Sequence, residues 1–237
     1  MKKAVILILL ALTTKGHSQF AKNMFSKDPI INLENFQKQR VYFGYYLGFN
    51  SFDFKFDYKT PVQQDIQVKK TTGFNVGVVA DLRLQEYINL RFEPGLYYTK
   101  RDLNYPNFTL QKDYLREVNS TYIHFPLLLK FSSLRTGNIR PYLVGGMSTT
   151  LNLSSNSKST DDNFEGKFRV KKWTAAYELG FGIDFFTEYF IFSPSVRGMF
   201  GITDELIRDK PINGPSPWTD NIDSMKSRAI LINFTFH

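Results

Sequence analysis

Apolar and polar residues alternate along most of the chain, and the clearest case runs from Ser120 to Phe131. Every second residue from Thr121 onward lies on one face of an extended strand, and that face is almost entirely apolar. The opposite face carries His124 and Lys130 among residues that are too apolar for a solvent-exposed surface. An apolar outer face combined with a crowded polar inner face is typical of a strand in a membrane-spanning β-barrel.

The same two-residue period recurs in eight stretches of the sequence. They are residues 41–56, 74–84, 88–99, 120–131, 140–153, 173–185, 190–197 and 229–236. Long polar connections precede the second, fourth, sixth and eighth stretches, whereas short turns precede the third, fifth and seventh. This alternation is the pattern of a bacterial barrel with short periplasmic turns and long extracellular loops. We therefore predict an all-β fold, an eight-stranded antiparallel transmembrane outer-membrane β-barrel, with both termini periplasmic.

The first stretch changes its pattern along its length. Its large apolar residues have odd numbers from Val41 to Phe49 and even numbers from Phe52 onward. We expect either a β-bulge near residues 50–51 or the exit of the strand from the membrane at that point.

The start of the sequence predicts a secretory signal peptide over residues 1–18. A basic start at Lys2 and Lys3 precedes a short apolar core, and small residues mark a cleavage site before Gln19. Residues 19–39 form a polar N-terminal segment in the periplasm, either a free tail or a piece that tucks into the barrel mouth. Residues 40–237 form the barrel. Because the chain has no cysteine, disulfides and a lipid anchor at the cleavage site are excluded.

Composition and charge narrow the class further. The formal charge of +8 falls to about +5 when the three lysines of the signal peptide leave, and no single element concentrates the basic residues. Nucleic-acid binding is therefore not expected. No window of about twenty apolar residues predicts a transmembrane helix. An aromatic content of 16% suits a barrel with aromatic girdles at both membrane interfaces.

Charged side chains lie at inward positions of the predicted strands. The predicted interior network contains Asp81, Arg83, Arg91, Glu93, His124, Lys130, Glu178, Asp184 and Arg197. An eight-stranded barrel is just wide enough for side chains to fill its interior, so we expect opposite charges to pair across strands and close the lumen. A path for a small solute is the alternative.

Candidate chemistry is sparse. An outer-membrane lipid-modifying enzyme needs a histidine with a serine and an acid, but the mature chain has only His124, which is inward, and the terminal His237. We predict no catalytic residue, cofactor or metal site. Asp161–Asp162, Asp220 and Asp223 are interpreted as solvated loop carboxylates, with weak calcium binding as the alternative. A soluble lipocalin-type barrel would reverse the polarity of the two faces.

Three blocks of the sequence together resemble the PorT family of the Bacteroidetes. They are residues 34–56, residues 120–130 and the Arg-Pro-Tyr-Leu-Val-Gly-Gly segment at residues 140–146. The first block is the more specific, and with the strand order the resemblance covers nearly the whole mature chain.

The resemblance implies a role in the type IX secretion system, which exports large surface and secreted proteins, including gliding-motility adhesins. Its expected partners are outer-membrane lipid and other components of that system, with no small-molecule substrate. Because a filled eight-stranded lumen cannot pass a folded protein, we expect an accessory or assembly factor and not the conduit. The alternatives are an outer-membrane lipid-modifying enzyme and a small-solute channel.

Overall fold

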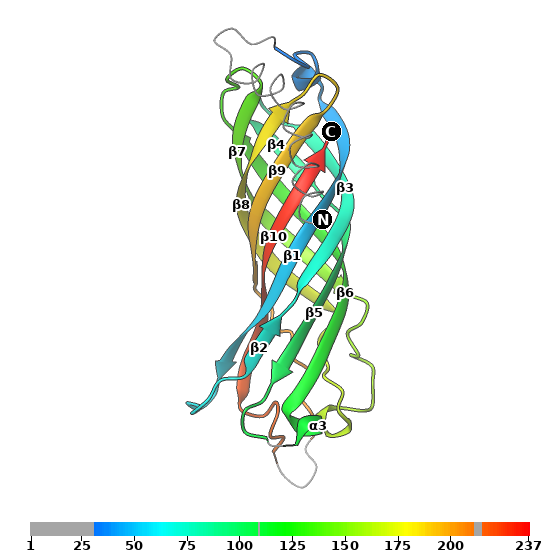
Figure 1. The fold of residues 1–237 in the computed structure, drawn as a ribbon, viewed down its shortest axis with the longest axis vertical. Coiled ribbons are helices and arrows are strands. Elements are labelled where there is room, and N and C mark those ends of the chain that lie inside the picture. Colours follow the sequence, from blue (N-terminus) through cyan, green and yellow to red (C-terminus); the bar gives the residue numbers. More distant parts are fainter. Residues whose placement is uncertain (1–30, 109, 211–214) are drawn as a thin grey trace, which may run out of the picture.

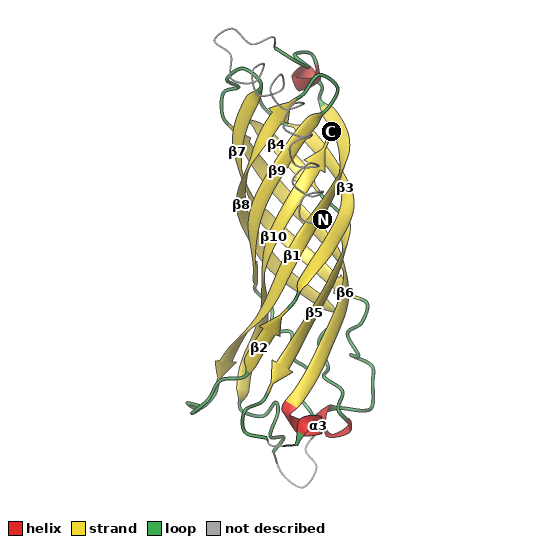
Figure 2. Cartoon of the chain, in the orientation of Figure 1, coloured by secondary structure: helices red, strands yellow, loops and turns green. Residues whose placement is uncertain are grey.

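The computed structural model describes residues 31–108, 110–210 and 215–237. The predicted signal peptide, residues 1–18, and the first part of the predicted N-terminal segment lie outside these residues. Ten strands make up nearly all of the regular structure (Figures 1 and 2). They are β1 (Val41–Tyr58), β2 (Gln67–Lys70), β3 (Thr72–Arg83), β4 (Ile88–Phe92), β5 (Gly95–Asn104), β6 (Leu115–Ser132), β7 (Ile139–Asn152), β8 (Trp173–Phe186), β9 (Ile191–Gly201) and β10 (Ile222–Phe236).

Within the described residues, three short helices accompany the strands. They are the 3-10 helices η1 (Phe36–Lys38) and η2 (Asn163–Glu165) and the four-residue α3 (Gln111–Tyr114). Across the described residues, no helix has the length and apolar character to cross a bilayer.

All strand pairs are antiparallel, and β1 pairs with β10 on one side and with β3 on the other. From β10 the pairing continues through β9, β8, β7 and β6 to β4 and β5, which pair in turn with β3. Because β4 and β5 share one position and β2 continues the position of β3, the ten strands occupy the eight expected positions. Figure 1 shows the barrel with the short turns at its upper end and the long connections, with α3, at its lower end.

The inner face of the barrel is charged and the outer face is apolar, which is the reverse of the arrangement in a soluble barrel. Phe43, Leu143 and Phe181 point outward and are 72%, 64% and 60% exposed, whereas Glu178 and Asp184 point inward and are 0% exposed. Apolar side chains in this number do not face water on a soluble barrel, because contiguous apolar patches of this size are rare on soluble monomers. The outer wall therefore suits hydrocarbon, and the lipocalin-type alternative does not fit.

Strand β1 corrects one of the two expectations for residues 50–51. Its register with β3 is unbroken from Val41 to Ser51, and with β10 the first irregularity lies at Asp57/Tyr58. The predicted bulge is therefore wrong. Phe52 and Phe54 point inward because the interior becomes apolar at this level, while Asp53 and Lys55 make the outer face polar. The outer face of β1 therefore leaves the apolar band at this point. This agrees with the second expectation, that the strand exits the membrane here.

Two connections are shorter than the sequence predicted. Strand β5 extends to Asn104 and β6 begins at Leu115, so both ends of the connection expected at residues 101–117 are paired. Strand β10 begins at Ile222, inside the connection expected at residues 204–226. These strand ends are more polar than the membrane stretches, which is why the sequence predicted connections there. Cross-strand hydrogen bonds nevertheless extend the strands through these polar residues.

The end of the barrel with the long connections encloses an apolar cluster, which we call the loop cluster. Its buried members are Phe54, Leu103, Tyr105, Val118, Phe168, Val170, Leu206, Trp218, Ile222 and Met225. The connections from β7 to β8 and from β9 to β10 meet there, since Val170 and Leu206 form a β-bridge. Trp218 stacks on Phe108 at 5.2 Å and donates from its Nε1 to the carbonyl oxygen of Asp113 at 3.1 Å. The loops therefore fold into the barrel mouth and cover it.

At the opposite end, the described part of the N-terminal segment lies against the barrel. The backbone N–H of Asn32 donates to Asn138 Oδ1 at 3.0 Å, and its side-chain amide donates to the carbonyl oxygen of Phe186 at 3.2 Å. Phe36 packs against Tyr42 with ring centroids 5.2 Å apart. Of the two alternatives for this segment, these contacts match a piece that docks at the mouth.

The outward stripe makes a prediction about lipid contact. Val78 is 58% exposed near the middle of the apolar stripe of β3, and Thr72 is exposed on the same face beyond it. We expect Val78→Arg to destabilise the protein in lipid vesicles by about 2–4 kcal/mol and Thr72→Arg by about 0–1 kcal/mol, because the cost of an arginine depends on depth in the bilayer. Urea unfolding of the reconstituted variants measures both. Equal costs would contradict a lipid-facing stripe.

Candidate functional site: the barrel interior

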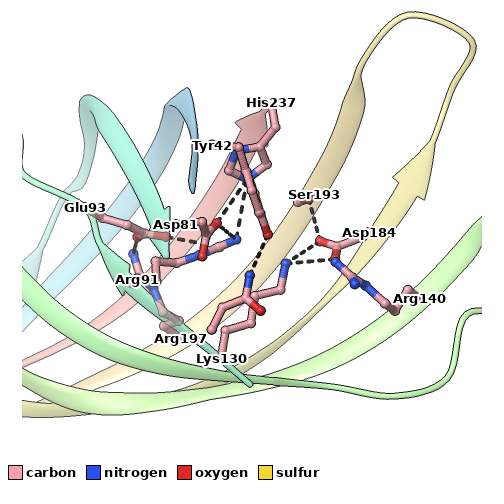
Figure 3. Close-up of polar contacts among 11 residues, drawn as sticks. Tyr42, Asp81, Arg91, Glu93, Lys130, Arg140, Asp184, Ser193, Arg197 and His237 are labelled. Atoms are coloured by element: carbon pink, nitrogen blue, oxygen red, sulfur yellow. Dashed lines mark hydrogen bonds and ion pairs between the residues drawn. The ribbon is translucent and has the colours of Figure 1, made fainter. Parts of the chain in front are cut away.

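The interior charges begin with a directly opposed pair on β3 and β4. Asp81 and Arg91 are register partners, and both are inward. Arg91 Nη2 lies 2.7 Å from Asp81 Oδ2, and Arg91 Nε lies 3.1 Å from each carboxylate oxygen (Figure 3). This two-pronged contact is the strong form of an arginine–carboxylate pair.

A row of ion pairs continues from Arg91 across the lumen. Arg91 Nη1 donates to Glu93 Oε1 at 3.2 Å, and the other oxygen of Glu93 lies 2.6 Å from Arg197 Nη2. Arg197 Nη1 in turn lies 3.4 Å from Glu178 Oε2. Glu93 follows β4, Arg197 lies on β9 and Glu178 on β8, so the row joins opposite walls of the barrel.

His124 ends this row. Its Nε2 lies 2.6 Å from Glu178 Oε1, its Nδ1 lies 2.8 Å from Thr150 Oγ1, and its ring meets Tyr97 edge to face at 4.9 Å. Both ring nitrogens are therefore occupied by protein groups. The side chain is 2% exposed and has no surface toward lipid or water.

A second group of charges surrounds Asp184 on β8. Lys130 Nζ lies 2.8 Å from both carboxylate oxygens, and Arg140 Nη2 lies 2.9 Å from Oδ2. Ser193 donates its hydroxyl to Oδ1 at 2.6 Å. Lys130 Nζ also lies 4.1 Å from the centre of the Tyr142 ring, a cation–π contact. Asp184 thus neutralises two cations that come from the neighbouring strands β6 and β7.

The two groups together balance their charge. The four carboxylates are Asp81, Glu93, Glu178 and Asp184, and the four cations are Arg91, Lys130, Arg140 and Arg197. Their side chains are at most 12% exposed. Buried charges are tolerated only when they are paired and hydrogen-bonded. Equal numbers of each sign allow the whole set to be ionised in the interior.

The structure places eight of the nine predicted network residues in these contacts. The ninth, Arg83, lies half-buried at the end of β3. It lines a cavity of about 340 Å³ at the short-turn mouth together with Glu34, Arg135 and Arg140. Arg83 therefore lies at the rim of the barrel.

His237 is an interior residue that sequence reasoning missed. Its Nε2 lies 3.6 Å from Asp81 Oδ2 and 3.4 Å from Arg91 Nη2, and its ring packs against Tyr42 at 5.2 Å. Its backbone pairs with Ile191 in both directions, at 3.0 and 2.9 Å. The alternation of β10 puts odd-numbered residues inward, so continuing it by one residue would have found His237.

Arg101 was also missed, because it was assigned to a connection. It is 0% exposed on β5, and its guanidinium lies 3.8 Å above the ring of Phe54. It donates to the hydroxyl groups of Ser120, Tyr122 and Ser227. Arg101 and the hydroxyl groups that it contacts thus form a polar layer between the two groups of interior charges and the loop cluster.

Glu205, from the connection after β9, reaches the same layer. It accepts from the Ser227 backbone N–H at 3.0 Å and from the Ser227 hydroxyl at 2.9 Å. Burial raises the pKa of the Glu205 carboxyl above its usual range, and nearby Arg101 opposes that effect. The loop carboxylate therefore ties the connection to the barrel wall.

The loop carboxylates considered for calcium lie in two kinds of surroundings. Asp162 caps η2 and accepts the backbone N–H groups of Phe164 at 3.0 Å and Lys210 at 3.2 Å, and Asp161 pairs with Lys167. Asp223 is exposed, as is Asp220. Among the described residues, no group of three or more acidic or histidine side chains is placed to hold a metal ion.

The interior is filled at several levels along the barrel. Large side chains with less than 2% exposure include Tyr46, Tyr97, Arg91, Lys130 and Arg197 in the charged region and Arg101 beyond it. Leu206, Ile222 and Met225 are equally buried in the loop cluster. Water in a pore would expose the side chains that line it. In the part of the chain that the structure describes, buried side chains therefore occupy the interior at successive levels.

An antiparallel barrel with an apolar outer wall and a charged interior defines an outer-membrane β-barrel protein. The family described as outer membrane protein beta-barrel domain matches residues 23–206, and the chain belongs to this family. Membership indicates the outer membrane as its location. None of the curated proteins compared with the chain matches it.

Several solved outer-membrane proteins are similar to the chain. OprG from Pseudomonas aeruginosa is 17% identical, with 82% of this chain and 94% of OprG covered and a TM-score of 0.44. AlkL is 13% identical, with 90% and 92% covered and a TM-score of 0.41. Ail, the attachment invasion locus protein of Yersinia pestis, is 10% identical, with 84% and 99% covered and a TM-score of 0.39.

The charge network makes a prediction about stability. Asp184→Asn leaves Lys130 and Arg140 without their buried counter-charge, so we expect a loss of about 3–5 kcal/mol. Glu117→Gln is the matched control, because it breaks a 3.0 Å pair between the side chains of Lys100 and Glu117, which are 41% and 51% exposed, and solvent screens such a pair so that its loss should change stability little. Urea unfolding in detergent micelles measures both. If Glu117→Gln destabilised the protein as much as Asp184→Asn does, the interior ion pairs would contribute no more to stability than an exposed pair.

Proposed function

We propose that the protein is a non-conducting outer-membrane barrel that supports the type IX secretion system as an accessory or assembly factor. The proposal that the barrel is non-conducting is based on its filled interior, from the charge network through Arg101 to the loop cluster. The proposed role in the type IX secretion system is based on the resemblance of residues 34–56, 120–130 and 140–146 to the PorT family.

The filled interior favours this role over transport through the lumen. A conduit for protein needs an opening far wider than an eight-stranded barrel provides. A small-solute channel needs a continuous wet path, but Arg91 and Arg197 cross the interior and are 2% exposed. The surfaces left for a secretion role are the loops, the mouth at residues 31–39 and the outer wall.

The surroundings of His124 favour a non-enzymatic role. A histidine that acts as a general base needs one ring nitrogen within reach of a substrate group. The two nitrogens of His124 contact Glu178 and Thr150, and the ring is enclosed next to Tyr97. We therefore propose that His124 stabilises the barrel and catalyses no lipid modification.

Deletion of the gene in the source bacterium tests the proposed function. We expect type IX cargo to disappear from the medium and the cell surface and the wild-type gene to restore export. The His124→Gln variant, which keeps an amide hydrogen bond toward Glu178 or Thr150, should also restore export and leave the lipid A mass spectrum unchanged. Normal secretion in the deletion strain would remove the secretion role, and altered lipid A would favour an enzyme.

A further inference from the structure

The outer wall of β1 and β10 changes from apolar to cationic within two adjacent rows. Ser51 on β1 pairs with Ile230 on β10, which is 59% exposed and ends the apolar stripe of that strand. The next outward rows pair Asp53 with Arg228 and Lys55 with Lys226. The two strands lie side by side in Figure 1, toward the end with the long connections.

The acids near these rows are already bonded to other groups. Asp53 accepts from Lys70 Nζ at 2.8 Å and from the backbone N–H of Phe54 at 2.9 Å. Asp57 accepts from Lys55 Nζ at 3.1 Å and from the Ser224 hydroxyl at 2.9 Å.

Two further cations, Lys226 and Arg228, are in excess of these acids. In the part of the chain that the structure describes, neither Lys226 nor Arg228 forms an ion pair or a side-chain hydrogen bond. Lys55 and Lys226 are also directly opposite each other, and like charges in that position destabilise a sheet. We call Lys55, Lys70, Lys226 and Arg228 the cationic patch, which has two more positive groups than the two carboxylates beside it.

The cationic patch adjoins an apolar surface on the side toward the membrane. Arg228 pairs across β10 and β9 with Phe200, which is 38% exposed and stacks on Tyr177 at 5.1 Å. Ile230 lies next along β10 on the same face. A molecule bound here would meet cations at one end and aromatic and aliphatic side chains at the other.

We propose that the cationic patch binds the phosphate-monoester headgroup of a lipid in the adjoining membrane leaflet. Arg228 and Lys226 supply charged donors to the phosphate, and the acyl chains lie over Ile230 and Phe200. Arginine pairs with phosphate through a planar fork of two N–H groups, and basic residues beside a membrane attract anionic lipids. Because the cations continue the apolar stripe, a lipid uses both surfaces, whereas a soluble anion uses one. The site needs only an outer-membrane barrel and is independent of the secretion role.

Native mass spectrometry of the purified full-length protein in detergent tests the proposal. The probes are lipid A with its phosphates and lipid A from which they have been removed. We expect the phosphorylated probe to bind at one site and the double variant Lys226→Gln/Arg228→Gln to weaken that binding by about ten- to thirtyfold, since each cation near a headgroup contributes a factor of up to about five. The variant Lys158→Gln/Lys210→Gln removes the same charge from exposed loops and should bind as the wild type does.

Three results would overturn the proposal. They are equal binding by the patch variant and the wild type, equal binding of both forms of lipid A, and displacement of lipid A by millimolar inorganic phosphate, which would assign the patch to a soluble anion. Because substitutions on an exposed face leave packing intact, both variants should fold, and heat-dependent gel mobility checks this.

Discussion

The structure depends on one constraint: charges enclosed by a wall that faces hydrocarbon must be neutralised inside the barrel. No water is available on the lipid side, and an eight-stranded interior has little room for it. The pairs Asp81–Arg91 and Asp184–Lys130 and the bridging residues Glu93 and Glu178 meet this constraint with equal numbers of each sign. The same contacts that neutralise the charges also fill the lumen, so stability and the proposed lack of conduction have a common cause.

The interior changes its character along the barrel axis. Charged groups fill the part inside the apolar band, Arg101 and Glu205 form a polar layer beyond it, and the loop cluster closes the end with the long connections. The proposed function therefore uses the outside of the molecule, because side chains already occupy the inside. The outer wall, the loops and the mouth are the surfaces through which such a protein contacts lipid or other proteins.

The alternation of apolar and polar residues predicted most of the fold because it records which face meets lipid. It placed Asp81, Glu178 and Asp184 on the inner face and Phe43 and Phe181 on the outer face, whereas the Gly145-Gly146 pair left the facing of residues 140–153 unassigned. It failed where the outer face leaves the membrane and the rule loses its physical basis: the parity change at Phe52 reflects an apolar interior and not a bulge. Arg101 was missed for the same reason, since strand pairing continues beyond the apolar band. The pairing partners of the charges depend on three-dimensional register, which spacing alone does not specify.

The most direct test of the account is the reactivity of interior cysteines toward a water-soluble thiosulfonate reagent in lipid vesicles. The chain has no cysteine of its own, so each introduced thiol is measured without background. Ser148 is inward on β7 and 2% exposed, whereas Thr160 is exposed in a loop. The account predicts that Ser148→Cys stays unmodified over the time in which Thr160→Cys reacts completely. Modification of the two positions at similar rates would show a wet, open lumen and would contradict the filled barrel.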